Sequence, residues 1–225
     1  MNKPINALVV LVSLLAGCTL KPPGTAPSAN YFYINPDRDL CSVGTVAVVE
    51  LDDDSDSPGL SEQMTATLFE AVQKRQLFSL FAVARDDPAW RNLALARQRL
   101  GSSENCTPVL SPGYSLAQLA ELRKSLNCNA ILTGRITHYR PYPHMAMGLR
   151  LRMIDLRDGR LLWALEQVWD TTDKTTQQQI TRYFHRQVGP DFAPLGKELA
   201  SVSPLKFMAF VAYEVAATLG SGRAR

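Results

Sequence analysis

The chain is poor in the residues from which most catalytic and metal sites are built. It has four cysteines and three histidines in 225 residues, and none of them stands in CxxC or HxxxH spacing, which argues against a zinc site. The GxSxG, HExxH, P-loop and dinucleotide-binding motifs are missing as well. We therefore expect no catalytic residue, no metal and no cofactor. A metal-dependent hydrolase is the remaining enzyme class, and a stoichiometric metal ion would reveal it.

Two further features that could bind metal are weak. His138 and His144 could meet across a hairpin, but two ligands without a third favour surface or turn histidines. The acidic run of Asp52, Asp53, Asp54 and Asp56 lacks the glycine and the glutamate of an EF-hand loop. We expect this run to be a solvated loop.

The chain also has no large excess of charge of either sign. It carries 24 basic and 21 acidic side chains, a formal net charge of +3. Nucleic-acid-binding domains concentrate far more positive charge than this. The balance predicts that nucleic acid is not a partner.

One apolar run stands at the N-terminus, and it is too short to span a bilayer. Lys3 precedes the run of residues 7–15, and polar residues and prolines follow from residue 19. This is the pattern of an export signal rather than of a membrane helix of about 20 residues. A plain secretory signal with a chance cysteine is the alternative to the lipid-anchored protein described next.

The end of that run resembles the lipobox of bacterial lipoproteins. Leu15, Ala16 and Gly17 precede Cys18, and the resemblance implies cleavage before Cys18 and acylation of that residue. Several acyl chains on one residue give stable anchoring, so the membrane would be a partner through the N-terminal lipid. Thr19 stands where lipoproteins retained in the inner membrane carry Asp. In a Gram-negative cell this predicts the outer membrane, with the protein on its periplasmic face.

Three cysteines remain for an oxidising compartment, in which one pair could form a disulfide. Cys106 and Cys128 flank an expected helix and are our first choice for the pair. Cys41 with either of them, or three reduced core thiols, are the alternatives.

The hydrophobic pattern predicts an α/β fold with a mixed sheet of about five strands in the order β-α-β-α-β-β-β, flanking helices and a helical C-terminal tail. We expect strands over residues 43–51, 77–83, 130–139, 146–155 and 161–169, and helices over 61–72, 89–100, 115–126 and much of 175–220. Residues 1–17 would be the signal peptide, 18–40 the lipidated cysteine and tether, 41–170 the α/β domain, and 171–225 a helical extension packed on it. The aromatic stretch 31–34 could dock the tether onto the domain.

The hairpin around residue 158 is the clearest local prediction. In the strand before it, Leu149, Leu151 and Met153 alternate with Arg150 and Arg152, so one face points inward and the other outward. Asp158-Gly159 then forms a tight turn, because glycine adopts a positive φ without strain.

Two groups of residues could contact a partner. Tyr139, Tyr142 and Met145 lie at or near an expected loop between strands, where exposed aromatic side chains suit protein interfaces. Packing of this loop on the chain's own C-terminal helices is the alternative. Arg135, Arg150 and Arg152 could line a basic face for an anionic glycan, although a solvated sheet is the simpler interpretation.

Three places resemble one known family, the first being the expected strand and amphipathic helix that open the domain. Residues 129–137 (NAILTGRIT) and 154–163 (IDLRDGRLLW) are similar to strands of the curli-export lipoprotein (CsgG) superfamily. The resemblance covers about residues 43–170 and concerns the fold rather than catalysis. It implies a CsgG-like outer-membrane lipoprotein without enzymatic activity.

The pore-forming members of that superfamily carry long amphipathic hairpins, and this chain offers none. The resemblance is therefore closer to relatives without the hairpins, such as the exopolysaccharide-export lipoprotein PelC and the lipoprotein activators of peptidoglycan synthases. It implies a scaffold or secretion accessory that binds an envelope protein or itself, including a homo-oligomeric ring. The alternative is an activator bound to a peptidoglycan synthase. A tether of about 20 residues spans only about 25 Å as a flexible coil, which favours work close to the membrane.

Overall fold

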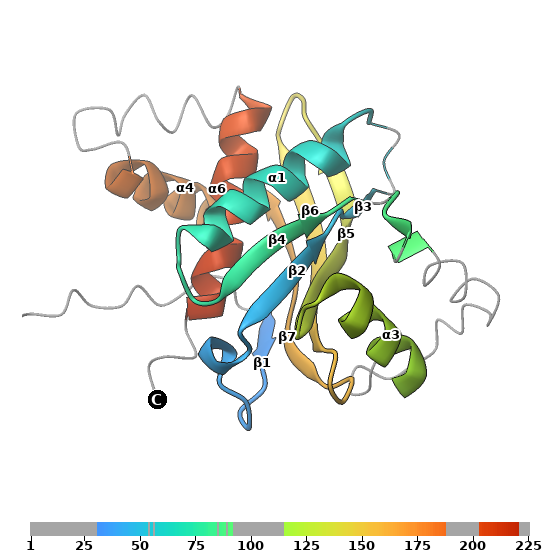
Figure 1. Ribbon diagram of the computed structural model, residues 1–225. Coiled ribbons are helices and arrows are strands. Elements are labelled where there is room, and N and C mark those ends of the chain that lie inside the picture. Colours follow the sequence, from blue (N-terminus) through green and yellow to red (C-terminus); the bar gives the residue numbers. More distant parts are fainter. Residues whose placement is uncertain are drawn as a thin grey trace, which may run out of the picture.

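One seven-stranded mixed sheet organises the domain (Figure 1). The computed structural model describes residues 31–53, 55, 57–84, 86–88, 90, 91, 115–187 and 203–220. The order across the sheet is β1-β7-β6-β5-β2-β4, and β3 pairs with β5 beyond the end of β2. The strands are β1 (Phe32–Ile34), β2 (Thr45–Val49), β3 (Asp52–Asp53), β4 (Ser79–Val83), β5 (Ala130–Arg140), β6 (Ala146–Asp155) and β7 (Leu161–Asp170).

The predicted α/β class is confirmed. All five expected strands are present, β2, β4 and β5 in parallel and β5, β6 and β7 as an antiparallel meander. Two short strands, β1 and β3, add to the expected five. They have three and two residues, too few to show a period of two in the sequence.

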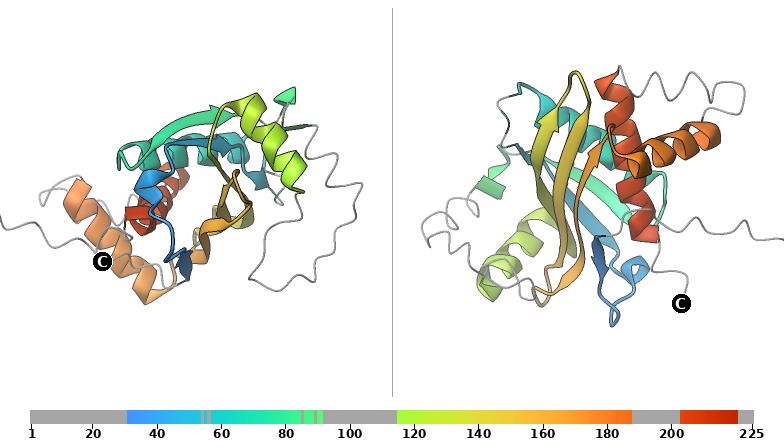
Figure 2. Two further views of the ribbon diagram at one scale, coloured as in Figure 1. Left: turned by 60° about the horizontal axis from the view of Figure 1, so that its bottom comes forward. Right: turned by 180° about the vertical axis from the view of Figure 1, so that it is seen from behind.

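The helices form unequal layers on the two faces of the sheet. α1 (Leu60–Gln73) and α6 (Pro204–Leu219) pack against each other on one face, and α4 (Lys174–Gln187) extends that layer beyond β7 (Figures 1 and 2). α3 (Leu116–Leu126) lies on the opposite face and covers only one end of it. None of the described helices is long and apolar enough to cross a membrane.

The hydrophobic periodicity places apolar residues inward on the helices, and this holds for α6 and, apart from the half-buried Ala71, for α1. It fails in α3, where Leu116 is 68% exposed and Ala120 is exposed. Met64, Leu68 and Val72 of α1 are buried, and the α6 stripe is buried as well, namely Phe207, Phe210, Val211, Val215 and Leu219. α3 begins with a capping box, in which Ser115 and Gln118 satisfy each other's backbone N–H groups. The expected helix over 89–100 lies outside the described residues except for positions 90 and 91.

The alternation predicted for β6 sets the position of the main core. Leu149, Leu151 and Met153 face α1 and α6 and are fully buried, whereas Arg150 and Arg152 point to the other side and are exposed. Trp163 of β7 joins the same core, and its indole Nε1 donates a hydrogen bond to Thr218 Oγ1 of α6 at 3.1 Å. This hydrogen bond satisfies the polar atom of a buried ring and fixes α6 over the sheet.

Gly134 permits a close contact within the sheet. A Cβ atom at this position would collide with the carbonyl oxygen of Arg150 and would lie 2.9 Å from Leu151 Cα. The backbones of β5 and β6 therefore approach each other closely at Gly134, a position that only glycine fits.

The turn between β6 and β7 is held by a buried carboxylate. Gly159 has a φ of 74°, as predicted for the Asp-Gly turn. The side chain of Asp155 is 1% exposed and accepts hydrogen bonds from the backbone N–H and the guanidinium of Arg157. This arrangement closes the hairpin at its base.

The aromatic stretch before residue 35 docks onto the sheet. Phe32–Ile34 pairs antiparallel with β7, and the backbone N–H of Glu166 donates to the carbonyl of Tyr31. Arg38 forms an ion pair with Asp158 of the β6–β7 turn, with 2.8 Å between Nη2 and Oδ2. The folded domain therefore includes part of the segment expected to be tether.

An aromatic cluster joins α4 to α6. The ring of Tyr183 lies 5.1 Å from Phe184, 5.8 Å from Phe210 and 5.0 Å from Tyr213 between centroids. The guanidinium of Arg75, just past the end of α1, stacks over Tyr213 at 5.0 Å. Burial, followed by the neighbouring Tyr213, raises the pKa of Tyr183. Buried residues of α4 and α6 therefore belong to the same core as the sheet.

Candidate interaction surface

The predicted lipidation site lies outside the described residues. This holds for Leu15, Ala16, Gly17 and Cys18, which stay predictions from the sequence. Cys106 also lies outside them. Cys41 and Cys128 form no disulfide with each other, and burial raises the pKa of Cys128. The Cys106–Cys128 pairing therefore stays a prediction.

The tip of the β5–β6 hairpin, residues 140–145, presents one of the three expected contact residues. Tyr142 is 62% exposed. Tyr139 is half-buried and packs against the main core. The expectation for Met145 is wrong, because its side chain is 1% exposed and belongs to the core. The alternation of Met145 with Met147 and Leu149 places all three on the inward face, a signal that was present in the sequence.

The hairpin tip is braced by Arg140. Its Nε donates to the carbonyl of His144 at 2.8 Å, and its Nη2 lies 2.7 Å from Asp170 Oδ2. Burial raises the pKa of Asp170, but hydrogen bonds from Thr172 and the charge of Arg140 outweigh it, so the pKa lies below its usual value. The carboxylate therefore stays charged at neutral pH, and the tip presents Tyr142 on a rigid loop.

The two histidines that could meet across the β5–β6 hairpin both lie at the surface. His138 lies on β5 and His144 at the hairpin tip, and both are exposed. In the parts of the chain that the structure describes, no three His, Cys, Asp or Glu side chains gather closely enough to hold a metal ion.

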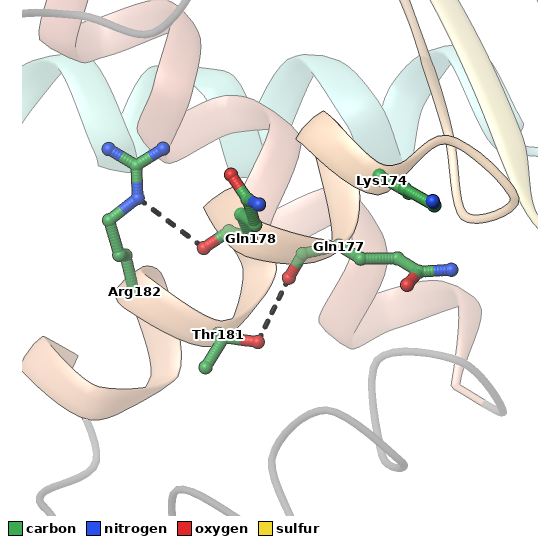
Figure 3. Close-up of a pocket in the computed structure, with 5 residues that line it drawn as sticks. All are labelled: Lys174, Gln177, Gln178, Thr181 and Arg182. Atoms are coloured by element: carbon green, nitrogen blue, oxygen red, sulfur yellow. Dashed lines mark hydrogen bonds between the residues drawn. The ribbon is translucent and has the colours of Figure 1, made fainter.

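A shallow hollow of about 590 Å³ lies along α4 (Figure 3). Its described lining consists of polar and basic side chains, namely Lys174, Gln177, Gln178, Thr181 and Arg182. Figure 3 shows these side chains spread along the helix rather than pointing to one centre. Thr181 and Arg182 donate to carbonyls of the preceding turn, so the hollow resembles a solvated helix surface rather than a built site.

The described helices leave much of the sheet uncovered on the side opposite α1 and α6. No described helix lies over the middle of β5, β6 and β7 on this side, as the right-hand view of Figure 2 shows. We call this surface the open face. The strand registers place the following residues on it: Tyr33, Thr133, Arg135, His138, Arg150, Arg152, Ala164, Glu166 and Val168.

Charged residues cross the open face in one row. Arg135 of β5 is the direct partner of Arg150 of β6, and Arg150 is the partner of Glu166 of β7. Arg150 and Glu166 form an ion pair at 2.5 Å. Asp52 of β3 lies beside Arg135 in the register. The row therefore has two adjacent cations with an acidic residue at each end.

A second row holds an aromatic ring and a further cation. Tyr33 is opposite Ala164, Ala164 is opposite Arg152, and Arg152 is opposite Thr133. Tyr33 is 46% exposed, and Arg152 is exposed. Among the described residues, Arg152 has no ion pair or side-chain hydrogen bond. The small Ala164 lies between the two residues in the register.

Sequence reasoning identified the three arginines of the open face and missed the aromatic ring beside them. Tyr33 comes from the segment expected to be tether, about 120 residues away in the chain from Arg152. The sequence signal was the alternation of tyrosine with Phe32 and Ile34 over residues 31–34. In the structure Tyr31 and Tyr33 are the more exposed residues of this stretch.

Comparisons with known proteins find similar solved structures. No family model matches the chain, and no curated protein matches it. A variant of PelC from Paraburkholderia phytofirmans, a dodecamer, has 13% identity and a TM-score of 0.42 over 80% of this chain and 87% of that chain. The hypothetical protein CT253 from Chlamydia trachomatis has 15% identity and a TM-score of 0.45 over 81% and 99% of the two chains. The C-terminal domain of LpoB from Salmonella enterica has 17% identity and a TM-score of 0.33 over 56% and 82%. At these identities and scores, the function has to be argued from the residues of this chain.

Proposed function

We propose that the protein is a non-catalytic lipoprotein of the outer membrane, anchored through Cys18, that serves in the periplasm as a scaffold or as an assembly or secretion accessory. The observation that carries the proposal is the open face. It presents exposed charged and aromatic side chains on a rigid sheet, as binding surfaces do. Its partner is an envelope protein or a second copy of this chain.

The distance from the anchor supports work near the membrane. β1 begins at Phe32, so the segment from Cys18 to Tyr31 is all that separates the anchor from the sheet. Even fully extended, it spans at most about 45 Å. The domain would therefore meet partners that are themselves close to the bilayer.

An activator of a peptidoglycan synthase is the second candidate. Tyr142 on the braced hairpin tip favours it, because a single exposed aromatic on a rigid loop suits a one-to-one contact. The short anchor segment opposes it, since such an activator has to reach across the periplasm. The two candidates differ in the expected assembly, a multimer for the scaffold and a monomer for the activator.

Light scattering on the chain without residues 1–18 separates these candidates. A discrete multimer over a wide concentration range supports a self-assembling scaffold. A persistent monomer removes the ring and leaves a tethered binding module.

Site-specific photo-crosslinking in the envelope then tests the open face. A crosslinker at Val168, which is 56% exposed on that face, should capture a defined partner or a second copy. The matched control is Lys124, exposed on α3. Equal products from both positions, or none from Val168, would contradict the proposed role of the face.

The anchor is tested separately. The wild-type chain should incorporate labelled palmitate and fractionate with the outer membrane, and Cys18→Ser should abolish both. Labelling that survives Cys18→Ser would refute the assignment of the lipid to that cysteine.

A further inference from the structure

We propose that the open face binds an extended anionic glycan bearing carboxylates, with Arg152 as the principal anion contact and Tyr33 as the platform for a sugar ring. This inference deepens the proposed function, because it rests on the open face being the binding surface and names the ligand. Four observations support it.

The first observation is an excess of positive charge on the open face. Three arginines stand there with two carboxylates, Glu166, which is paired with Arg150, and Asp52, which lies beside Arg135 in the register. Arg135 and Arg150 are direct cross-strand partners, and like charges in that position destabilise a sheet. Each of these two has an acidic neighbour in the row, so Arg152 is the cation whose charge is left for an anion.

The second observation is the geometry of the Tyr33 row. Tyr33 and Arg152 lie on either side of Ala164, two strand spacings or about 10 Å apart. A sugar ring resting over Ala164 would contact the face of the tyrosine and present a carboxylate to the guanidinium. Thr133, next to Arg152 and half-buried, adds a hydroxyl on the far side.

The third observation is the repeat of cations along β6. Arg150 and Arg152 are two residues apart and therefore about 7 Å apart along the strand. A linear polymer with regularly spaced carboxylates can engage both. Arginine suits this contact, because its planar guanidinium donates two parallel hydrogen bonds to a carboxylate.

The fourth observation favours a glycan over a protein for the centre of the open face, which leaves the edge at Val168 to the protein partner. The centre of a stable protein interface is apolar and depleted of charge. The middle of the open face is arginine and glutamate instead, and its exposed large apolar side chains, Tyr33 and Val168, stand at the edges. A hydrated, charged polymer needs no apolar centre.

Isothermal titration calorimetry of the full chain in non-ionic detergent tests the inference with a galacturonate oligomer as the probe. The wild-type chain should bind the oligomer, and added salt should weaken the binding. The same oligomer with methyl-esterified carboxylates should not bind. Arg152→Ala should weaken binding roughly tenfold or more, and Tyr33→Ala should cause a smaller loss.

Arg182→Ala is the matched control, since it removes an exposed arginine from α4 away from the open face. It should leave binding unchanged, and circular dichroism should show all three variants folded. Absence of binding, or equal losses in Arg152→Ala and Arg182→Ala, would overturn the inference. Equally tight, Arg152-dependent binding of an oligoglutamate would also overturn it, and would assign the face to an acidic peptide.

The outcome is separable from that of the proposed function. Failure of glycan binding together with crosslinks from Val168 to a defined partner overturns only the ligand. Failure of both overturns the role of the open face itself.

Discussion

The buried carboxylate of Asp155 makes a sharp test of how the β6–β7 hairpin is held. Its Oδ1 accepts from the backbone N–H and Nε of Arg157, both at 2.9 Å, and its Oδ2 accepts from Nη2 at 2.7 Å. The side chain of Asp155 is 1% exposed, and that of Arg157 is 39% exposed. Asp155→Asn keeps the size of the side chain, removes the charge and points an amide donor at a guanidinium that can only donate.

The cost follows from these contacts. A hydrogen bond to a charged group contributes about 1.5–3 kcal/mol, and breaking a fully buried ion pair costs about 3–5 kcal/mol. Because Arg157 can still reach water, we expect Asp155→Asn to lower the free energy of unfolding by about 2–3 kcal/mol. If the free energy of unfolding falls by about 2 kcal/mol for each molar of urea, the urea concentration at the midpoint of unfolding should fall by roughly 1–1.5 M.

The effect should also depend on pH in a defined direction. Burial raises the pKa of Asp155, but hydrogen bonds from the side chain and backbone of Arg157, and then the charges of Arg157 and Arg38, outweigh it. The net pKa lies below the ordinary value of 3.8. The charged form therefore stabilises the fold fully above that value, and the contribution is lost as pH falls through it towards the folded pKa. The gap between wild type and Asp155→Asn should be constant from pH 7 to about pH 5 and shrink below about pH 4.

The matched control is Glu166→Gln, which removes a carboxylate from an ion pair in which Glu166 is 62% exposed. It should change the free energy of unfolding by about 0.5 kcal/mol or less. Equal midpoint shifts for the two variants, or an Asp155→Asn shift that stays the same at pH 3, would refute the reasoning.

Three further predictions follow from contacts of single residues. Gly134→Ala should lower the free energy of unfolding, measured with a chemical denaturant, by at least about 2 kcal/mol, because the new Cβ collides with the carbonyl of Arg150. Unchanged stability would mean that β5 and β6 can move apart there without cost. Trp163→Phe should lower the free energy of unfolding by about 1–3 kcal/mol, because it removes the hydrogen bond to Thr218 and part of a buried ring. In a double-mutant cycle, a smaller loss of stability in a Thr218→Val background would measure the contribution of the hydrogen bond. Ser115→Ala should lower stability by about 1 kcal/mol through loss of the cap, with hydrogen exchange rising first at the start of α3; exchange unchanged there would argue against the cap.

Much of the fold could be predicted because its long elements carry strong local patterns. The alternation in β6, the Asp-Gly turn and the apolar stripe of α6 each identify an element within ten to twenty residues. β1 and β3 could not be predicted, because two or three residues become strand only through pairing with β7 or β5. Such pairing is a property of the tertiary fold.

The candidate surface was harder to predict than the fold. The sequence shows that Arg150 and Arg152 face away from the core, but it does not show whether a helix covers them. That depends on where α3 packs, and α3 covers Ile131 and Ile154 near one end of β5 and β6. Tyr33 reaches the same surface only because β1 docks onto β7. The opposite error arose at Met145, where the loop position was given more weight than the alternation that buries it.

The docking of β1 has a mechanical consequence for an anchored protein. Any pull from a lipid on Cys18 enters the domain at Tyr31 and acts first on the short pairing of β1 with β7. The next connections along the chain are the hydrogen bonds that Asn35 donates to the carbonyls of Leu161 and Leu162, and then the Arg38–Asp158 ion pair. All these contacts come before the first residue of β2. They can therefore break, and lengthen the linker to the anchor, while the central strands stay paired. Detachment of β1 would then protect the core from the applied force. Tyr33 would leave the open face when β1 detaches from β7.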